Sequence, residues 1–81
     1  DPDWKIRYRA AEALGIMKDR RAVEPLILIL SDEKDHVRYR AAKSLGYIGD
    51  PAAREPLRAC QQDENHYVRT LASSVVTRLS D

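Results

Sequence analysis

A 31-residue repeat runs through the sequence and constrains its fold more than any other feature. Residues 3–33 and 34–64, compared without gaps at a shift of 31, share 14 identities in 31 positions, where average residue usage gives about two or three. Residues 65–81 keep 4 of the 17 residues of 34–50. The chain therefore holds two full units and the first half of a third, and we expect residues 1–81 to form a single domain that is part of a longer array.

Apolar residues within each unit recur at the spacing of one helical face. In the first unit their steps are four, three, one and three, at Ile6, Ala10, Ala13, Leu14 and Met17. The repeat of this pattern predicts an all-α solenoid of stacked helical hairpins, with five antiparallel helices near 3–17, 22–31, 35–48, 52–62 and 66–79. The positions predicted to be buried are Ile6, Leu14, Leu26, Leu30, Val37, Leu45, Ile48, Leu57, Val68 and Val76.

Turn-forming residues separate the two helices of each unit. Asp19 and Asp50 suit the cap of a second helix. Pro25 and Pro56 follow these caps by six residues, where a proline inside a helix would remove a hydrogen bond. The sequence therefore predicts a tight turn at 20–22 and a regular helix that begins near the proline.

Glycines mark two further features of the first helices. Gly49 suits the left-handed residue that ends a helix, and in the first unit Lys18 must take that conformation at a cost of about 1 kcal/mol. Gly15 and Gly46 lie one turn earlier. We expect these two to allow a neighbouring helix to approach closely.

Residues 37–57 read Val-Arg-x-x-Ala-Ala-x-x-Leu-Gly-x-Ile-Gly-Asp-x-x-Ala-x-Glu-Pro-Leu. This pattern resembles the short HEAT-like repeat named after phycobilisome lyases, and the resemblance extends over nearly the whole chain. It implies a stack of helical hairpins. Proteins of this type include bilin lyase subunits, C-terminal modules of larger enzymes and plain scaffolds, so an accessory subunit of a bilin lyase is one interpretation, resting on the resemblance alone.

Composition excludes several classes of protein. Fourteen Lys and Arg against 13 Asp and Glu leave a net charge of +1, which gives no global field to attract nucleic acid or a membrane surface. The longest apolar run, Leu26 to Leu30, is too short to span a bilayer, and no charged and apolar leader opens the sequence. We expect a cytoplasmic protein without a membrane partner.

Residues capable of catalysis or metal binding are few and scattered. The two histidines, His36 and His66, occupy non-equivalent positions, so they do not form a repeated ligand pair. The single Cys60 excludes an internal disulfide and a cysteine-based zinc site, and it is interpreted as a small apolar residue. No phosphate loop or nucleophile elbow occurs. The sequence predicts no enzyme activity, cofactor or metal.

One arginine recurs in every unit beside the buried face, at Arg7, Arg38 and Arg69. An arginine there can lie along the edge of the core and bond to a carboxylate or a helix-end carbonyl of a neighbouring unit. Asp19 and Asp50 are the carboxylates we expect. We predict that these five residues have a structural role.

Large aromatic residues fall on the solvent side of the first helices, where tyrosine and tryptophan are typical of binding hot spots. We predict that this side binds a partner protein or peptide through Trp4, Tyr8, Arg9, Tyr39, Arg40, Lys43 and Tyr67. The alternative for some of the aromatics, Trp4 above all, is packing on a neighbouring unit.

A second hypothesis is a nucleic-acid docking module. Basic residues interleaved with aromatics suit phosphate contacts and base stacking. On this side four basic residues, Lys5, Arg9, Arg40 and Lys43, stand against two acidic residues, Glu12 and Asp35. The surplus of two positive charges is small beside the number of phosphate contacts that a typical specific binder makes.

The last half-unit lacks a second helix to cover its apolar residues. Val75, Val76 and Leu79 stand on this helix. We therefore predict that the C-terminal end of the stack exposes apolar surface, or buries it by self-association.

Overall fold

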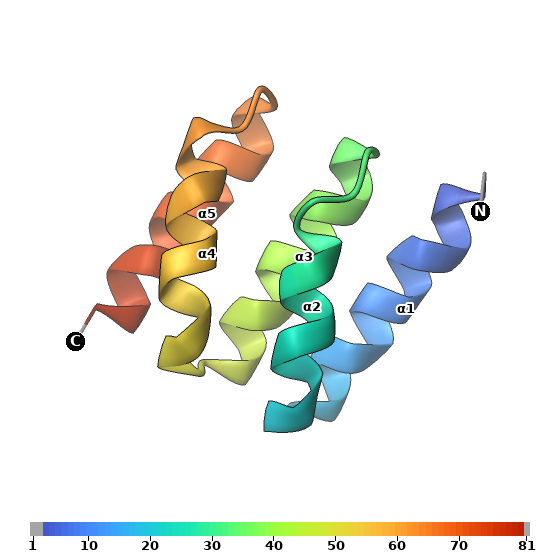
Figure 1. Cartoon of the computed structure of the whole chain (residues 1–81), viewed down its shortest axis with the longest axis horizontal. Helices are drawn as coiled ribbons and strands as arrows, with labels where there is room; N and C mark the ends of the chain where they lie inside the picture. Colours follow the sequence, from blue (N-terminus) through green and yellow to red (C-terminus); the bar gives the residue numbers. More distant parts are fainter. Residues whose placement is uncertain (1–2, 81) are drawn as a thin grey trace.

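The computed structural model describes residues 3–80, and all regular structure within this range is helical. Five α-helices follow one another in up-down order (Figure 1): α1 (Trp4–Met17), α2 (Val23–Ile29), α3 (Asp35–Ile48), α4 (Arg54–Ala59) and α5 (His66–Leu79). Short 3-10 turns occupy Arg20–Ala22, Pro51–Ala53 and Cys60–Gln62. The predicted all-α solenoid of helical hairpins is confirmed. Residues 1, 2 and 81 of the predicted domain lie outside the described part.

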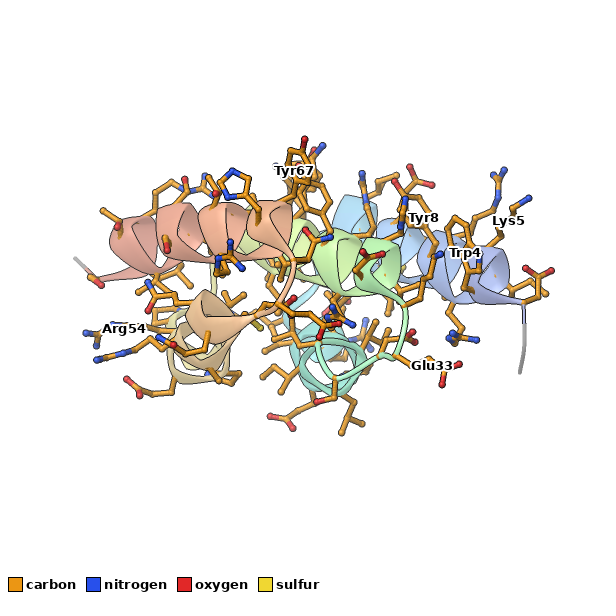
Figure 2. All side chains as sticks on the ribbon, turned by 90° about the horizontal axis from the view of Figure 1, so that it is seen from above. Trp4, Lys5, Tyr8, Glu33, Arg54 and Tyr67 are labelled. Carbon is orange, nitrogen blue, oxygen red and sulfur yellow. The ribbon has the colours of Figure 1, made fainter. Side chains whose placement is uncertain are left out.

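The helices form two layers. α1, α3 and α5 lie side by side in one layer, and α2 and α4 lie in the other (Figures 1 and 2). α2 packs mainly on α3, and α4 mainly on α5, so each second helix supports the first helix of the next unit. The result is a flat slab with extents of 37 × 28 × 15 Å, whose first-helix layer presents one broad face away from α2 and α4.

The turns between the helices follow from their capping residues. The Asp19 carboxylate accepts the backbone N–H of Arg21 at 2.9 Å, and Asp50 accepts that of Ala52 at 2.9 Å. The predicted turn at 20–22 is confirmed, and α2 begins at Val23. Prolines therefore fall within the first turn of α2 and α4, where a backbone N–H has no partner inside the helix.

Two residues end first helices in the left-handed conformation, as predicted. Lys18 has φ of 52° after α1, and Gly49 has φ of 73° after α3. The second α-helices are shorter than the predicted 22–31 and 52–62: α2 covers Val23–Ile29 and α4 covers Arg54–Ala59. A 3-10 turn, Cys60–Gln62, follows α4.

Most of the predicted core is confirmed. Seven of the predicted residues are buried: Leu26, Leu30, Val37, Leu45, Leu57, Val68 and Val76. Leu14 and Ile48 are half-buried. The prediction for Ile6 is wrong, because its side chain is 60% exposed. Ile6 lies on the side of α1 that faces away from α3, and no described segment covers that side.

The first helices approach one another closely where glycine was predicted to allow it. The Ser44 hydroxyl of α3 donates to the Ala11 carbonyl of α1 at 2.7 Å. A Cβ on Gly15 would overlap both the side chain and the Cα of Ser44. A Cβ on Gly46 would lie 3.1 Å from a methyl group of Val75 on α5. The equivalent glycines thus set the spacing of the whole layer.

The C-terminal end does not expose the apolar residues that the sequence suggested. Val75 is 1% exposed and Val76 is 9% exposed, and Leu79 is half-buried against the core. The prediction of an open apolar C-terminal end is wrong, because α5 packs on α3, on α4 and on the 3-10 turn Cys60–Gln62.

Candidate partner-binding surface

A hollow of about 280 Å³ opens on the outer side of the first-helix layer, and we call it the tyrosine hollow. Its lining residues are Tyr8, Asp35, His36, Tyr39, Asn65 and Tyr67. The three tyrosines come from α1, α3 and α5, so all three units contribute. Tyr67 is 70% exposed, whereas Tyr8 and Tyr39 are half-buried. Figure 2 shows Tyr8 and Tyr67 on the side of the layer away from α2 and α4.

A network of polar groups fixes the rim of the tyrosine hollow. Asp35 makes hydrogen bonds with His36 Nδ1 at 2.8 Å and with Asn65 Nδ2 at 2.7 Å. Asn65 Oδ1 accepts the backbone N–H of Tyr67 at 2.8 Å and so caps α5. The hydrogen bond with His36, and then the one from Asn65, lower the pKa of Asp35. The hollow therefore carries a fixed carboxylate at neutral pH.

Trp4 lies in a second hollow of about 490 Å³ beside the first, with neighbours of its own chain. Its ring centroid is 6.3 Å from that of Tyr8 and 5.1 Å from that of His36. The ammonium of Lys34 lies 4.8 Å from the Trp4 ring centroid. Trp4 is half-buried, and its ring contacts Tyr8, His36 and Lys34. These contacts favour packing within the chain over the role of a free surface residue.

Arg40 does not lie on the exposed surface, contrary to the prediction. Arg40 is 9% exposed. Its Nη2 lies 3.9 Å from Glu12 Oε2, and its guanidinium carbon lies 5.8 Å from the Tyr47 ring centroid. The neighbouring helix α1 covers it. The equivalent Arg9 is exposed, because no described segment flanks α1 on that side, and Lys43 is half-buried.

The repeated arginines bind carboxylates other than the expected ones. Arg7 makes two hydrogen bonds to Asp32, at 2.6 and 3.1 Å, and Arg38 makes two to Asp63, at 2.8 and 3.0 Å. The expected partner Asp19 pairs instead with Arg21 at 2.7 Å, which lowers its pKa to about 2.

Asp50 lies 3.8 Å from Arg20, so it too is engaged elsewhere. Both expected aspartates stand at the end of the helices opposite to the arginines, because they cap the turn that follows each first helix.

The same arginines also bind the connections between units. Arg38 donates to the Asp32 carbonyl at 2.9 Å, and Arg69 donates to the Asp63 carbonyl at 2.7 Å. The hydrogen bond from Arg7 lowers the pKa of Asp32. Burial raises the pKa of Asp63, but the hydrogen bonds from Arg38 and from the Asn65 N–H outweigh this effect, so the net pKa lies below its ordinary value. These contacts hold the N-terminal ends of α3 and α5, where the tyrosine hollow lies.

The acidic, histidine and cysteine side chains of the described residues do not gather into a metal site. Within residues 3–80, no three His, Cys, Asp or Glu side chains converge as a metal site would require. Cys60 is buried, burial raises the pKa of its thiol, and its Sγ donates to the Pro56 carbonyl at 3.8 Å. None of the helices in the same range has the length and apolar character needed to cross a membrane.

A two-layer stack of similar helical hairpins defines a helical-repeat protein. Residues 1–76 match the family described as HEAT repeats. The chain therefore belongs to the HEAT repeat family, whose members are commonly scaffolds for protein interactions. A search of curated proteins found no match.

Proposed function

We propose that this chain is a non-catalytic protein-interaction module that binds a peptide segment of a partner protein at the tyrosine hollow. The observation that carries the proposal is the convergence of Tyr8, Tyr39 and Tyr67, from three successive units, on one concave site. Tyrosine gains much when it is desolvated by a partner and loses little side-chain entropy. HEAT repeats commonly serve as interaction scaffolds, and this supports the class of function.

The chemistry of the hollow favours a basic side chain of the partner. Aromatic ring faces attract cations within about 6 Å of the ring centroid. The carboxylate of Asp35 adds a full negative charge, held in place by His36 and Asn65. We therefore infer that a lysine or arginine of the partner occupies the hollow, with flanking residues of the partner lying along α3 and α5.

A nucleic-acid partner has less support than the sequence suggested. Because Arg40 is buried against Glu12, only three of the four basic residues counted on this side could reach a phosphate. Affinity for nucleic acid depends on several phosphate contacts, which this surface lacks. The bilin lyase interpretation rests on the resemblance of residues 37–57, and both it and the cytoplasmic location stay predictions.

Displayed random peptides selected against the wild-type chain supply the probe for a direct test. Their Kd values, measured by fluorescence anisotropy, should rise about 5- to 150-fold with Tyr67→Ala. This variant keeps the fold, because Tyr67 is 70% exposed. Asp35→Asn should weaken only the peptides that contain lysine or arginine.

Arg58→Ala is the matched control, since Arg58 is exposed on α4 in the other layer. Its Kd should equal that of the wild type. An equal loss of affinity in Arg58→Ala and Tyr67→Ala would place the binding site outside the tyrosine hollow.

A further inference from the structure

The second hollow has no part in the proposed function, and we call it the tryptophan hollow. It has a volume of about 490 Å³, and its lining residues are Trp4, Lys5, Tyr8, Arg9, Glu12 and His36. All of these belong to α1 except His36, which belongs to α3. Tyr8 and His36 also line the tyrosine hollow, so the two hollows adjoin. Figure 2 shows Trp4, Lys5 and Tyr8 on the same side of the first-helix layer as Tyr67.

The tryptophan hollow has a net positive charge. Lys5 and Arg9 are exposed, and no ion pair within the described part of the chain engages either of them. The one carboxylate among the lining residues, that of Glu12, lies 3.9 Å from Arg40 Nη2 and is shared with it. The Asp3 carboxylate accepts the backbone N–H of Lys5 at 3.0 Å and caps α1. Two cations without an acidic partner therefore remain for a ligand.

The tyrosine hollow has the opposite charge. Its lining includes one carboxylate, that of Asp35, and no lysine or arginine. His36 Nδ1 at 2.8 Å and Asn65 Nδ2 at 2.7 Å hold this carboxylate in place. Because the two hollows adjoin, a ligand with one positive and one negative group would be attracted to both, in one orientation only.

The repeat places the two hollows in successive grooves of the layer. At a shift of 31 residues, Trp4 and Lys5 correspond to Asp35 and His36, so the second unit has an acidic residue where the first has a tryptophan. The position of Lys5 is exposed in every unit, because His36 and its next equivalent, Tyr67, are exposed as well. It therefore faces solvent both in α3, which has a first helix on each side, and in α1 and α5.

The packing of the first helices sets the distance between the two hollows. Helices in contact have axes about 8–10 Å apart. Successive residues of an extended chain advance by about 3.3 Å each. Two side chains of one extended segment can therefore enter adjoining hollows when they stand about two or three positions apart.

We propose that the tryptophan hollow binds an acidic side chain of the same partner segment whose lysine or arginine occupies the tyrosine hollow. This inference rests on the proposed function, to which it adds a second charged group and a direction for the segment. One flank of the basic residue lies along α3 and α5, and the other crosses to α1. The acidic residue stands on this second flank, about two or three positions from the basic residue. Its carboxylate accepts hydrogen bonds from Lys5 and Arg9.

A displayed peptide library with one fixed lysine and randomised flanks tests the proposal. Peptides enriched on the wild-type chain should carry Asp or Glu about two or three positions from the lysine, always on the same side. Selection on Lys5→Glu should remove this preference, because the substitution reverses a charge of the tryptophan hollow. The fold is retained, since Lys5 is exposed, and the lysine of the peptide should still be required.

The two proposals fail in different ways. Enriched peptides that need their lysine but show no acidic preference would overturn the further inference and leave the proposed function standing. Enriched peptides whose lysine can be replaced by alanine without loss of affinity would contradict the basic group in the tyrosine hollow, and both proposals with it.

Kd values from fluorescence anisotropy measure the coupling between the two charges. Replacing the acidic residue of an enriched peptide by its amide should raise the Kd on the wild-type chain about 2- to 10-fold. Lys5→Gln should raise the Kd of the acidic peptide by a similar factor and leave that of the amide peptide unchanged.

Arg58→Gln is the matched control, because it removes an exposed charge from α4 in the other layer. It should change the Kd of neither peptide. Equal effects of Lys5→Gln on both peptides, or an effect of Arg58→Gln as large as that of Lys5→Gln, would overturn the proposal.

Discussion

Leu45→Ala tests the packing of the stack at its centre. Leu45 is 0% exposed in α3, the helix that lies between α1 and α5 and on α2. The substitution removes three carbon atoms, worth about 2 kcal/mol in transfer free energy at about 0.8 kcal/mol each. The unfilled cavity raises the cost, so we expect a loss of about 2–5 kcal/mol in the free energy of unfolding.

This loss is large beside the total stability. A chain of 81 residues has roughly 4–12 kcal/mol at the usual 0.05–0.15 kcal/mol per residue. Urea unfolding followed by circular dichroism measures the change, and the fluorescence of Trp4 gives a second probe of the same transition.

Leu28→Ala makes the same chemical change on the surface and serves as the control. Leu28 is 77% exposed on α2, so its truncation should cost less than about 0.5 kcal/mol. A loss below about 1 kcal/mol for Leu45→Ala, or equal losses for the two variants, would refute the assigned packing.

Three further predictions concern pH, backbone strain and nucleic acid. The pKa values of Asp32 and Asp63 are lowered in the folded chain, so their stabilising effect is present above the unfolded pKa of about 3.9 and is lost as pH falls through the lower folded values. Asp63→Asn should reduce the loss of free energy of unfolding that occurs between about pH 5 and about pH 2, as measured by urea unfolding. An unchanged loss over this range would contradict the ion pair. Lys18→Gly should raise the free energy of unfolding by about 0.5–1 kcal/mol, because Lys18 has φ of 52°; a loss of stability would contradict this. Single-stranded DNA should bind with a Kd weaker than about 100 µM at physiological salt, and tighter, steeply salt-dependent binding in an anisotropy titration would favour a nucleic-acid partner.

The sequence predicted the fold well because the repeat states the same local rules twice. Fourteen identities in 31 positions include the capping aspartates, the glycines of close approach and the prolines of the second helices. Each of these has one physical reading: a cap, a helix contact or a first-turn position. The α3 and α5 boundaries accordingly match the predicted 35–48 and 66–79.

The errors have a common cause. The spacing of apolar residues identifies the apolar face of a helix, but it does not show whether another helix covers that face. Ile6 and Val75 lie on equivalent apolar faces, yet one is exposed and the other is 1% exposed. Arg9 and Arg40 differ in the same way. Whether a face is covered depends on the order of units along the stack. The uncovered face lies on α1 and not on α5, where the sequence predicted it.

The sequence also did not show which aspartate binds each repeated arginine. Asp32 and Asp63 repeat as faithfully as Asp19 and Asp50, so spacing alone gave no preference. The choice follows from the up-down order of the helices. A second helix brings its last residues back to the level where the first helix begins, and this places Asp32 beside Arg7.

The most direct test of the proposed function is a titration of the ¹⁵N-labelled chain with the tightest selected lysine- or arginine-containing peptide, followed by amide chemical shifts. The account predicts that the largest changes cluster at Tyr8, Tyr39, Asn65 and Tyr67, four of the six residues that line the tyrosine hollow. Changes confined to α2 and α4, with these four amides unmoved, would contradict it.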